Sequence, residues 1–370
     1  MKTKVTSERL YSLDALRGFD MFWIIGAEEL FHRMAEVAPG PFWKFMSGQF
    51  QHPLWHGFTS YDLIFPLFLF LAGVATPYAL GNLLSQGTSK KSLLRKVIKR
   101  GLILVLLGVI YNNGLNLLPL DEIRFPSVLG RIGLAYMFAN IIYLYSNRRA
   151  RYFWIGGLLL GYWALLFLHA APGYVHGDLS MEGNVVSYLD RTLLPGKLYR
   201  GIHDPEGLMA TLPAIATALL GIFTGELLRA TSVEKKVATV LRLTVLGIGA
   251  LILAQVWNLV FPINKNLWTS SFVLQCGGIS MLLMALFYYI IDVLGHRKWA
   301  FFFKVIGMNS ILIYLSSHFI NWSFTTRRLF GWVGQLFGEP YDSVAMVICL
   351  VAVQWAFLYL LYKQRIFLRV

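Results

Sequence analysis

An imidazole and a carboxylate stand just ahead of a long apolar stretch. His52 and Asp62 belong to the run HPLWHGFTSYDLIFP at residues 52–66, and the apolar residues 67–75 follow directly. A histidine ring changes its charge near neutral pH, so it can accept or donate a proton during a reaction. At the mouth of a membrane helix it can meet a dissolved substrate while its surroundings exclude bulk water. His52 is therefore our candidate for a general base.

Two carboxylates are candidates to assist it. Asp62 could orient a histidine, bind a cation, or simply cap the helix that follows, since Asp is common at helix N-caps. Glu28 lies near the outer end of the first expected helix, where it could contact a substrate. We take His52, Glu28 and Asp62 together as the predicted catalytic residues.

The composition predicts a membrane protein. Of 370 residues, 56% are hydrophobic and only 14% are charged, and the mean hydropathy is +0.58. Soluble domains have roughly a quarter of their residues charged. We predict an all-α, polytopic bundle that forms one transmembrane domain over residues 1–370. A spanning helix needs roughly 20 mostly apolar residues, and ten segments qualify: about 12–32, 60–84, 97–114, 128–147, 152–170, 208–229, 238–261, 268–292, 300–321 and 343–363.

The net charge of +14 follows the predicted topology. With ten spans and a cytoplasmic N-terminus, roughly two thirds of the 33 Lys and Arg residues fall on the inner side. This is the positive-inside bias, and it predicts that both termini are cytoplasmic. We therefore expect the basic residues to face anionic lipid, with the bilayer as partner and no nucleic acid.

Several other chemistries lack support in the sequence. The two cysteines, Cys276 and Cys349, both fall inside expected spans, so we predict no disulfide framework. No histidine pair has the spacing of a metal site, and we expect no metal. The chain has no Gly-rich phosphate loop or Walker pattern, which weighs against an ATP-driven pump.

The first expected span carries charges that are costly within a membrane. Asp14 and Arg17 are i,i+3 neighbours that can pair, either to line a polar passage or to lock the helix end. On a regular helix, Arg17 and Glu28 would lie within roughly 20° of each other around the axis and about 16 Å apart along it. One face of this helix is therefore expected to line a passage between the two membrane surfaces.

Other polar residues near the expected outer helix ends, or inside the spans, are candidates to bind a substrate. Carboxylates among them could bind an amine, amides could hydrogen-bond a sugar, and the indole could stack on a sugar ring. Each of these residues could instead have a purely structural role. With Asp14 and Arg17, the set is Arg131, Asp204, Glu206, Asn264, Lys265, Trp268, Asn309 and His318.

Two features concern packing and cover. The long outward segment at about 171–207 is rich in Gly and Pro, and we expect a folded loop that covers or lines the site. Gly157 and Gly161 have the small-xxx-small spacing that favours close helix packing.

Five runs, in order along the chain, resemble the transmembrane acetyltransferase family of lysosomal heparan-α-glucosaminide N-acetyltransferase and its bacterial relatives. The most specific is the His…Trp-x-Gly…Asp-Leu-x-Phe-Pro pattern of residues 52–66. The others are Arg9–Gly18, Val128–Leu134, Asp204–Gly207 and Asn264–Thr269.

The resemblance implies a multi-pass acetyltransferase of the inner (cytoplasmic) membrane. Such an enzyme would transfer an acetyl group from cytoplasmic acetyl-CoA to the amine of a glucosamine-type sugar on the opposite side of the membrane. The family's active-site histidine corresponds to His52. We expect Lys90, Lys91, Arg95 and Arg100 to meet the CoA phosphates. The loop that leads to His52 is longer than in the lysosomal enzyme, so heparan itself is not assumed to be the acceptor.

Several alternatives stay open at this point. His52 could act as a base or carry the acetyl group itself. The protein could instead be an O-acyltransferase of envelope polysaccharide, or a permease for sugars or muropeptides. Whether it forms a homodimer is also open.

Overall fold

The computed structural model describes residues 10–115 and 118–368, which are mainly helical and include no β-strand. Arg9, in the first of the five runs, lies outside these residues. Two isolated bridges, between Arg124 and Gly196 and between Ala170 and Asn184, tie loops together.

The α-helices are α1 (Tyr11–Phe22), α2 (Glu29–Val37), α3 (Pro41–Gln49), α4 (Ile64–Ser85), α5 (Lys90–Asn113), α6 (Val128–Tyr145), α7 (Arg148–Leu168), α8 (Val185–Leu193), α9 (Thr211–Arg229), α10 (Lys236–Asn258), α11 (Ser270–Tyr288), α12 (Ala300–Gly307), α13 (Ser310–Phe319), α14 (Trp322–Phe337) and α15 (Asp342–Lys363). Short 3₁₀ or π turns are η1 (Trp23–Ala27), η2 (Ser60–Leu63), η3 (Leu120–Glu122), η4 (Val233–Lys235) and η5 (Tyr289–Val293).

The all-helical class and the apolar helices are as predicted, but the count of ten spans is not confirmed. Among the described residues, seven helices are long and apolar enough to cross a membrane. The pair α12 and α13, bent by 66° at its break, would make an eighth span. The first and third predicted segments are also helical. However, charges and a break interrupt the first, and α5 begins at Lys90 rather than at residue 97, so it includes a strongly basic start.

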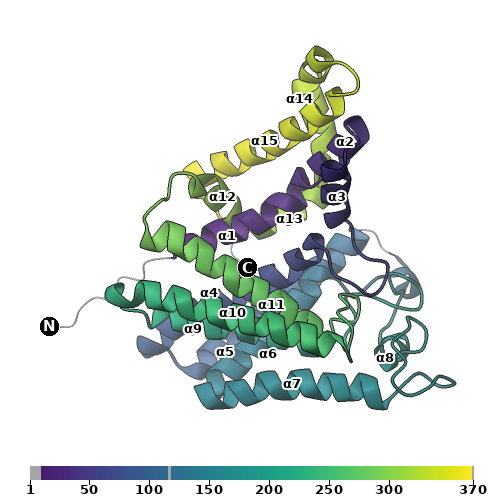
Figure 1. The fold of residues 1–370 in the computed structure, drawn as a ribbon, viewed down its shortest axis with the longest axis vertical. Helices are drawn as coiled ribbons and strands as arrows, with labels where there is room; N and C mark the ends of the chain where they lie inside the picture. Colours follow the sequence, from purple (N-terminus) through teal and green to yellow (C-terminus); the bar gives the residue numbers. More distant parts are fainter. Residues whose placement is uncertain (1–9, 116–117, 369–370) are drawn as a thin grey trace.

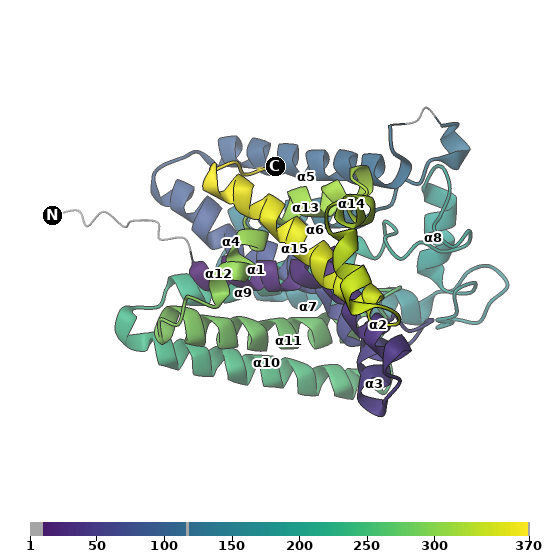
Figure 2. The same ribbon diagram turned by 90° about the horizontal axis from the view of Figure 1, so that it is seen from above.

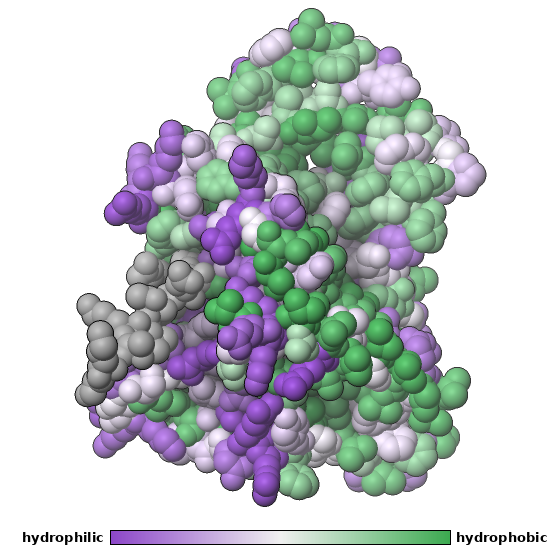
Figure 3. All heavy atoms as spheres, turned by 60° about the vertical axis from the view of Figure 1, so that its left-hand side comes forward, coloured by the Kyte–Doolittle hydropathy of each residue, from purple (hydrophilic) through white to green (hydrophobic). Residues whose placement is uncertain are grey.

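The long helices run side by side and alternate in direction. In Figure 1, α1 begins and α15 ends on the left, while α8 and its neighbouring loops lie on the right. The left side also holds the starts of α5, α7 and α10, whose first residues are Lys90, Arg148 and Lys236. Figure 3 turns this side forward and shows hydrophilic side chains gathered down its middle, with mainly apolar surface above and to the right. The basic helix starts therefore share one side, opposite the loops around α8.

The first predicted span is not one regular helix. Gly26 has φ 119° within η1, a backbone conformation that residues with a side chain rarely adopt. The chain changes direction there before α2 begins at Glu29. The predicted alignment of Arg17 with Glu28 on one helix face assumed regular geometry, so it does not hold across this break.

Helices α4 and α9 form a closely packed pair at the centre. A Cβ atom at Gly73 would overlap the backbone of α9, and one at Gly221 would overlap the carbonyl of Phe70 on α4. Leu69 and Ala216 are fully buried in the same core. Without side chains at these glycines, the two backbones can approach each other closely, as small residues allow in membrane helices.

The predicted packing role of Gly157 and Gly161 is wrong. Both lie on α7, and a Cβ atom at either would meet no atom within 4 Å. Their spacing matches the motif, but this face of α7 points away from its neighbours in the described part of the chain.

This contrast gives a stability prediction. Gly221→Ala should lower the apparent thermal unfolding midpoint of the purified protein, because overpacking a tight contact costs about 1–3 kcal/mol. Gly157→Ala is the matched control and should leave the midpoint unchanged or slightly higher, since Ala favours the helix. Equal midpoints for the two variants would contradict close α4–α9 packing.

Candidate active site

The ring of His52 is held by a buried carboxylate. His52 Nδ1 lies 2.7 Å from Asp62 Oδ1, and the Asp62 side chain is fully buried, whereas that of His52 is 44% exposed. The other oxygen, Asp62 Oδ2, accepts a hydrogen bond from the Thr59 backbone N–H at 3.0 Å. A carboxylate accepts hydrogen bonds, so these partners assign the ring proton to Nδ1 and leave Nε2 as an acceptor. The same carboxylate thus orients the imidazole and caps η2.

The ammonium of Lys265 faces the other nitrogen of the ring. Lys265 Nζ lies 2.9 Å from His52 Nε2 and 3.6 Å from Asp62 Oδ1. Lys265 belongs to the turn between α10 and α11. Burial lowers the pKa of its amine, while the charge of Asp62 acts in the opposite direction. An amine therefore already lies within hydrogen-bonding distance of Nε2.

Two cavities meet at this cluster. One, of about 230 Å³, reaches between α1, α4, α6 and α13 and is lined mainly by apolar residues such as Met21, Phe68 and Ile132. The other, of about 300 Å³, lies under the loops, and charged and polar side chains such as Asp62, Arg124 and Arg200 line much of it; it is called the polar cavity below. The residues that line both cavities are His52, Val128, Glu206 and Lys265. His52 can therefore be reached from an apolar and from a polar compartment.

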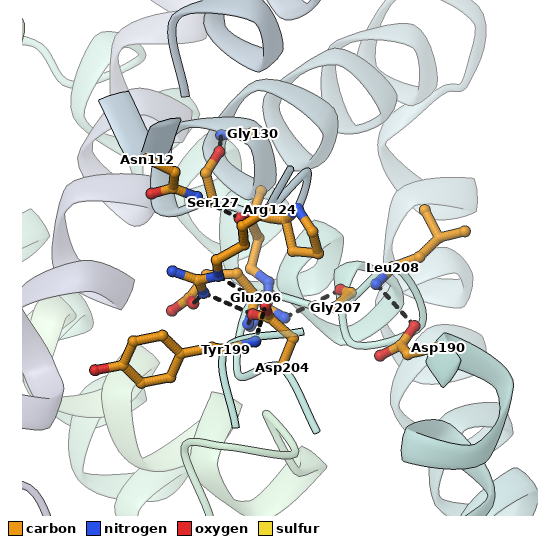
Figure 4. Close-up of polar contacts among 12 residues, drawn as sticks. Asn112, Arg124, Ser127, Gly130, Asp190, Tyr199, Asp204, Glu206, Gly207 and Leu208 are labelled. Carbon is orange, nitrogen blue, oxygen red and sulfur yellow. Dashed lines mark hydrogen bonds and ion pairs between the residues drawn. The ribbon is translucent and has the colours of Figure 1, made fainter. Parts of the chain in front are cut away.

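Arg124 ties the loops beside the polar cavity together (Figure 4). Its Nε and Nη2 donate to the two oxygens of Asp204 at 2.8 and 2.7 Å, and Nη2 also donates to Glu206 Oε2 at 2.6 Å. The Tyr199 backbone N–H donates to Asp204 Oδ2 at 2.9 Å. Burial alone would raise the pKa of Asp204, but the hydrogen bonds and charge of Arg124 outweigh it and hold the pKa below its usual value. Asp204 thus stays ionised and positions Glu206.

The start of α9 is fixed from two sides around Gly207. Asp190 Oδ1 accepts hydrogen bonds from the backbone N–H groups of Leu208 and Met209 at 2.9 and 3.3 Å. Arg131 Nη2 donates to the Gly207 carbonyl at 3.1 Å. A Cβ atom at Gly207 would overlap the Asp190 carboxylate. A residue with a side chain would not fit between these two groups, which explains why the run Asp204–Gly207 ends in glycine.

Some predicted substrate-binding residues are buried supports. The guanidinium of Arg131 lies 4.9 Å above the Trp268 ring, and both residues are almost fully buried. Trp268 Nε1 donates to Thr217 Oγ1 at 3.3 Å, so the indole is packed inside the bundle and lines neither cavity. The Asn264 side chain contacts His56 Nδ1 at 3.2 Å and accepts from the Leu267 N–H at 2.9 Å. These contacts hold the turn that presents Lys265.

Other predicted residues lie away from His52. Asp14 and Arg17 pair at 3.6 Å near the start of α1. The Asn309 amide donates to the Ile366 carbonyl at 2.9 Å and accepts from the Leu368 N–H at 3.0 Å, and so fixes the C-terminal segment. The ring of His318 lies 5.1 Å from that of Tyr111 and lines neither cavity.

Glu28 is likewise separate from the cluster. It follows the break at Gly26, and it lines neither cavity at His52. Its Oε2 is buried and has no hydrogen-bond partner among the described residues. Of the three predicted catalytic residues, the structure brings His52 and Asp62 into contact, whereas Glu28 reaches the cluster only through its charge interaction with Tyr61, whose ring lies 4.8 Å from that of His52.

The basic residues assigned to CoA lie along α5. Arg100 packs 4.6 Å above the Tyr136 ring, Lys90 lies 5.7 Å from the Tyr145 ring, and Arg95 borders a shallow surface hollow. Neither they nor Lys91 line the cavities at His52.

A second basic group gathers at the start of α1. Lys304, Lys363 and Arg365 line a cavity of about 470 Å³ there, together with Asp14 and Met308. Three chain segments supply these residues, so the sequence, which places the three cations on the inner side, did not show that they meet in one cavity.

Three further side chains at the site were missed. Arg124 lies in a short loop outside every recognised run, and the carboxylates that it binds are 80 and 82 positions away. Arg200 lines the polar cavity and donates to the Leu54 carbonyl at 3.1 Å. The ring of Tyr61 lies 4.8 Å from that of His52. Tyr61 belongs to the recognised run and directly precedes Asp62, so of these three residues it was the one that the sequence could have singled out.

Among the described residues, no three His, Cys, Asp or Glu side chains form a group that could hold a metal ion. The groups that surround the His52 ring are the Asp62 carboxylate, the Lys265 amine and the Tyr61 ring. The first two can exchange or hold protons at the ring nitrogens.

The ion pairs of Arg124 with Asp204 and Glu206, which we call the Arg124 clamp, lead to a stability prediction. Arg124→Ala should lower the thermal unfolding midpoint and speed proteolysis within residues 171–207, because breaking one side of a buried ion pair costs about 3–5 kcal/mol. Adding Asp204→Asn should recover part of this loss by removing the unpaired charge.

Arg191→Ala is the matched control. Arg191 donates to the backbone carbonyls of Ile202 and Glu182 at 2.8 and 3.0 Å, so its removal leaves no buried charge unpaired. A loss for Arg124→Ala no larger than for Arg191→Ala would contradict the clamp.

Comparison with known proteins identifies the family. Residues 9–242 match the family model described as heparan-alpha-glucosaminide N-acetyltransferase, catalytic. The human enzyme of that name is 27% identical over 98% of this chain, and the mouse enzyme 28% over 99%. The aligned regions cover 60% and 61% of those proteins, so the chain spans about three fifths of their length. The resemblance seen in the five sequence runs is confirmed. This apolar, helical chain is a membrane protein and belongs to the catalytic family of heparan-alpha-glucosaminide N-acetyltransferase, a family of acetyltransferases.

Proposed function

We propose that the protein transfers acetyl from acetyl-CoA on the cytoplasmic side to the amine of a glucosamine-type sugar on the opposite side. In a bacterial cell this would take place in the inner membrane, with both chain termini in the cytoplasm. The observation that carries the proposal is the position of His52, where an apolar cavity within the bundle meets a polar cavity under the loops.

The acceptor belongs in the polar cavity. Arg124, Tyr199, Arg200 and Glu206 line it and offer hydrogen bonds of both kinds, as a sugar requires. The Lys265 amine lies 2.9 Å from His52 Nε2, which supports a position for an amino group beside this ring atom. A substrate amine would take this place, with the carboxylates of Asp62 and Glu206 near it to balance a positive charge.

The acetyl donor belongs in the apolar cavity. The acetyl end and pantetheine arm of CoA are largely uncharged, whereas its phosphates need cations and cannot cross hydrocarbon. The basic cavity of Lys304, Lys363 and Arg365 lies at the other end of α1. On α1, Asp14 borders the basic cavity and Met21 the apolar one, roughly 10 Å apart along the helix.

The break between α12 and α13 lies between the same two cavities. Met308 lines the basic cavity and Ser310 lines the apolar one, with the 66° bend between them. A break of this kind gives a span an irregular segment beside a cavity. We therefore favour this route for the CoA arm over the basic residues of α5.

The reaction can be written with His52 as the base. The neutral amine attacks the thioester carbonyl carbon, a C–N bond forms, and the C–S bond breaks. His52 Nε2 takes the proton lost by the amine and returns one to the departing CoA thiolate. Asp62 holds the Nδ1 proton throughout and stabilises the charged ring, as an orienting carboxylate does for a catalytic histidine.

The acetyl-carrier route uses the same ring atom. His52 Nε2 would attack the thioester carbonyl first, and the C–S bond would break to release CoA as its thiolate. The amine would then attack the acetyl carbon and displace the imidazole, and the proton that the amine loses balances the one taken up by the thiolate. The two routes differ in kinetics, since only the second gives ping-pong behaviour and a trapped acetyl-enzyme.

The direct test uses labelled acetyl-CoA and glucosamine with the purified protein. The wild type should transfer label, and His52→Ala should lose nearly all transfer, since general acid–base catalysis alone contributes about 10²–10⁴-fold. Asp62→Asn should also lose activity, because the ring would lose its ionised partner.

His176→Ala is the control for the loss of a histidine on the same side. His176 is exposed in the loop before α8, and it lines neither cavity at His52. Its variant should retain full transfer. Equal activity in His52→Ala and His176→Ala would remove His52 from the mechanism.

A second test concerns the CoA phosphates. The double variant Lys363→Ala with Arg365→Ala should raise KM for acetyl-CoA by roughly tenfold or more, since a hydrogen bond to a charged group contributes about 1.5–3 kcal/mol. Its kcat should change less. The matched variant Lys90→Ala with Lys91→Ala should leave KM almost unchanged, and the reverse ranking would place the phosphates at α5.

A further inference from the structure

A second large cleft lies between α2, α14 and α15. It has a volume of about 760 Å³ and shares no lining residue with the two cavities at His52. Its walls carry charged, hydroxyl and amide side chains above an apolar floor of Met346, Val347 and Leu350. The proposed acetyl transfer does not use this cleft.

Charges of both signs line the cleft. Arg33 pairs with Glu29 at 2.7 Å. The side chains of Arg327, Glu339 and Asp342 form no hydrogen bond or ion pair in the described ranges. With two cations against three carboxylates, the lining has a slight excess of negative charge. A ligand that carries both a cation and an anion would match these groups better than a simple anion.

A buried hydroxyl in the wall also lacks a partner. Thr326 is 1% exposed and lines the cleft, yet its Oγ1 has no hydrogen-bond partner in the described part of the chain. Buried polar groups are nearly always hydrogen-bonded, and an exception needs an explanation. A polar ligand in the cleft would supply the missing bond. Gly331, Gly334 and Gly338 keep the same wall free of side chains.

Helix α14, beside this cleft, has the features of a helix that lies along a membrane surface. Figures 1 and 2 show that α14 crosses the direction of the long helices, and it appears end-on in the second view. Its large apolar side chains are strongly exposed, with Phe324 at 56%, Trp332 at 58%, Leu336 at 74% and Phe337 at 64%. A helix with such a face, lying across the bundle, is typical of the interface between headgroups and acyl chains.

We propose that this cleft binds the headgroup of a zwitterionic phospholipid with a primary amine, of the phosphoethanolamine type. The phosphate would meet Arg327, and the ammonium would donate to Glu339 and Asp342. A primary ammonium can donate hydrogen bonds to these carboxylates, whereas a quaternary one cannot. The acyl chains would lie along the exposed apolar face of α14.

The test measures lipid retained by the protein in native mass spectrometry. The full chain is taken from nanodiscs that contain equal amounts of phosphatidylethanolamine and phosphatidylglycerol. The wild type should retain one phosphatidylethanolamine per chain in preference to phosphatidylglycerol. Arg327→Gln and Asp342→Asn should each reduce that retention at least about fivefold.

Arg328→Gln is the matched control. Arg328 is the next residue on α14, carries the same charge, and lies 5.2 Å from the Phe324 ring rather than in the lining of the cleft. It should retain the lipid as the wild type does. A thermal midpoint equal to that of the wild type shows that each variant is folded.

Three results would overturn the proposal. They are equal lipid loss in Arg327→Gln and Arg328→Gln, equal retention of the two lipids, and displacement of the lipid by glucosamine, which would make the cleft a sugar site. Lipid retention needs no acetyl transfer, so failure of this proposal and failure of the proposed activity are distinguishable.

Discussion

The Asp62 carboxylate is fully buried at the start of α4, where an unpaired charge would be costly. Its two oxygens are occupied by the His52 ring and the Thr59 backbone, and Lys265 lies close by. The partners that stabilise the Asp62 charge therefore come from both the loop before α4 and the turn between α10 and α11, and they bring these two segments together. The three alternatives raised for Asp62, as cap, histidine partner and cation neighbour, are one arrangement.

The loops around α8 contain a second buried carboxylate that is stabilised by a residue distant in sequence. Asp204 is buried and is matched by Arg124 from a loop 80 positions earlier, and Glu206 comes with it to the edge of both cavities. Figure 4 shows Arg124 between the two carboxylates, with the Asp190 contact to Leu208 beside them. A polar compartment is thus built against an apolar one without leaving either carboxylate unpaired. Acetyl transfer across a membrane would need this arrangement.

The sequence predicted what depends on local pattern. Apolar runs located the long helices, and one short run contained both His52 and Asp62. It could not predict that Lys265, 213 positions away, faces the same ring. It also misjudged α7, since the spacing of Gly157 and Gly161 says nothing about which face of a helix meets a neighbour. Contacts of this sort depend on how the helices pack.

The central claim is that the two substrates reach His52 from opposite compartments. The most direct measurement is an experimental structure of the protein with a non-hydrolysable acetyl-CoA analogue. The account predicts the acetyl group within hydrogen-bonding reach of His52 Nε2, the arm in the apolar cavity and the phosphates at Lys363 and Arg365. An analogue bound with its acetyl group away from His52, or entering through the polar cavity, would contradict it.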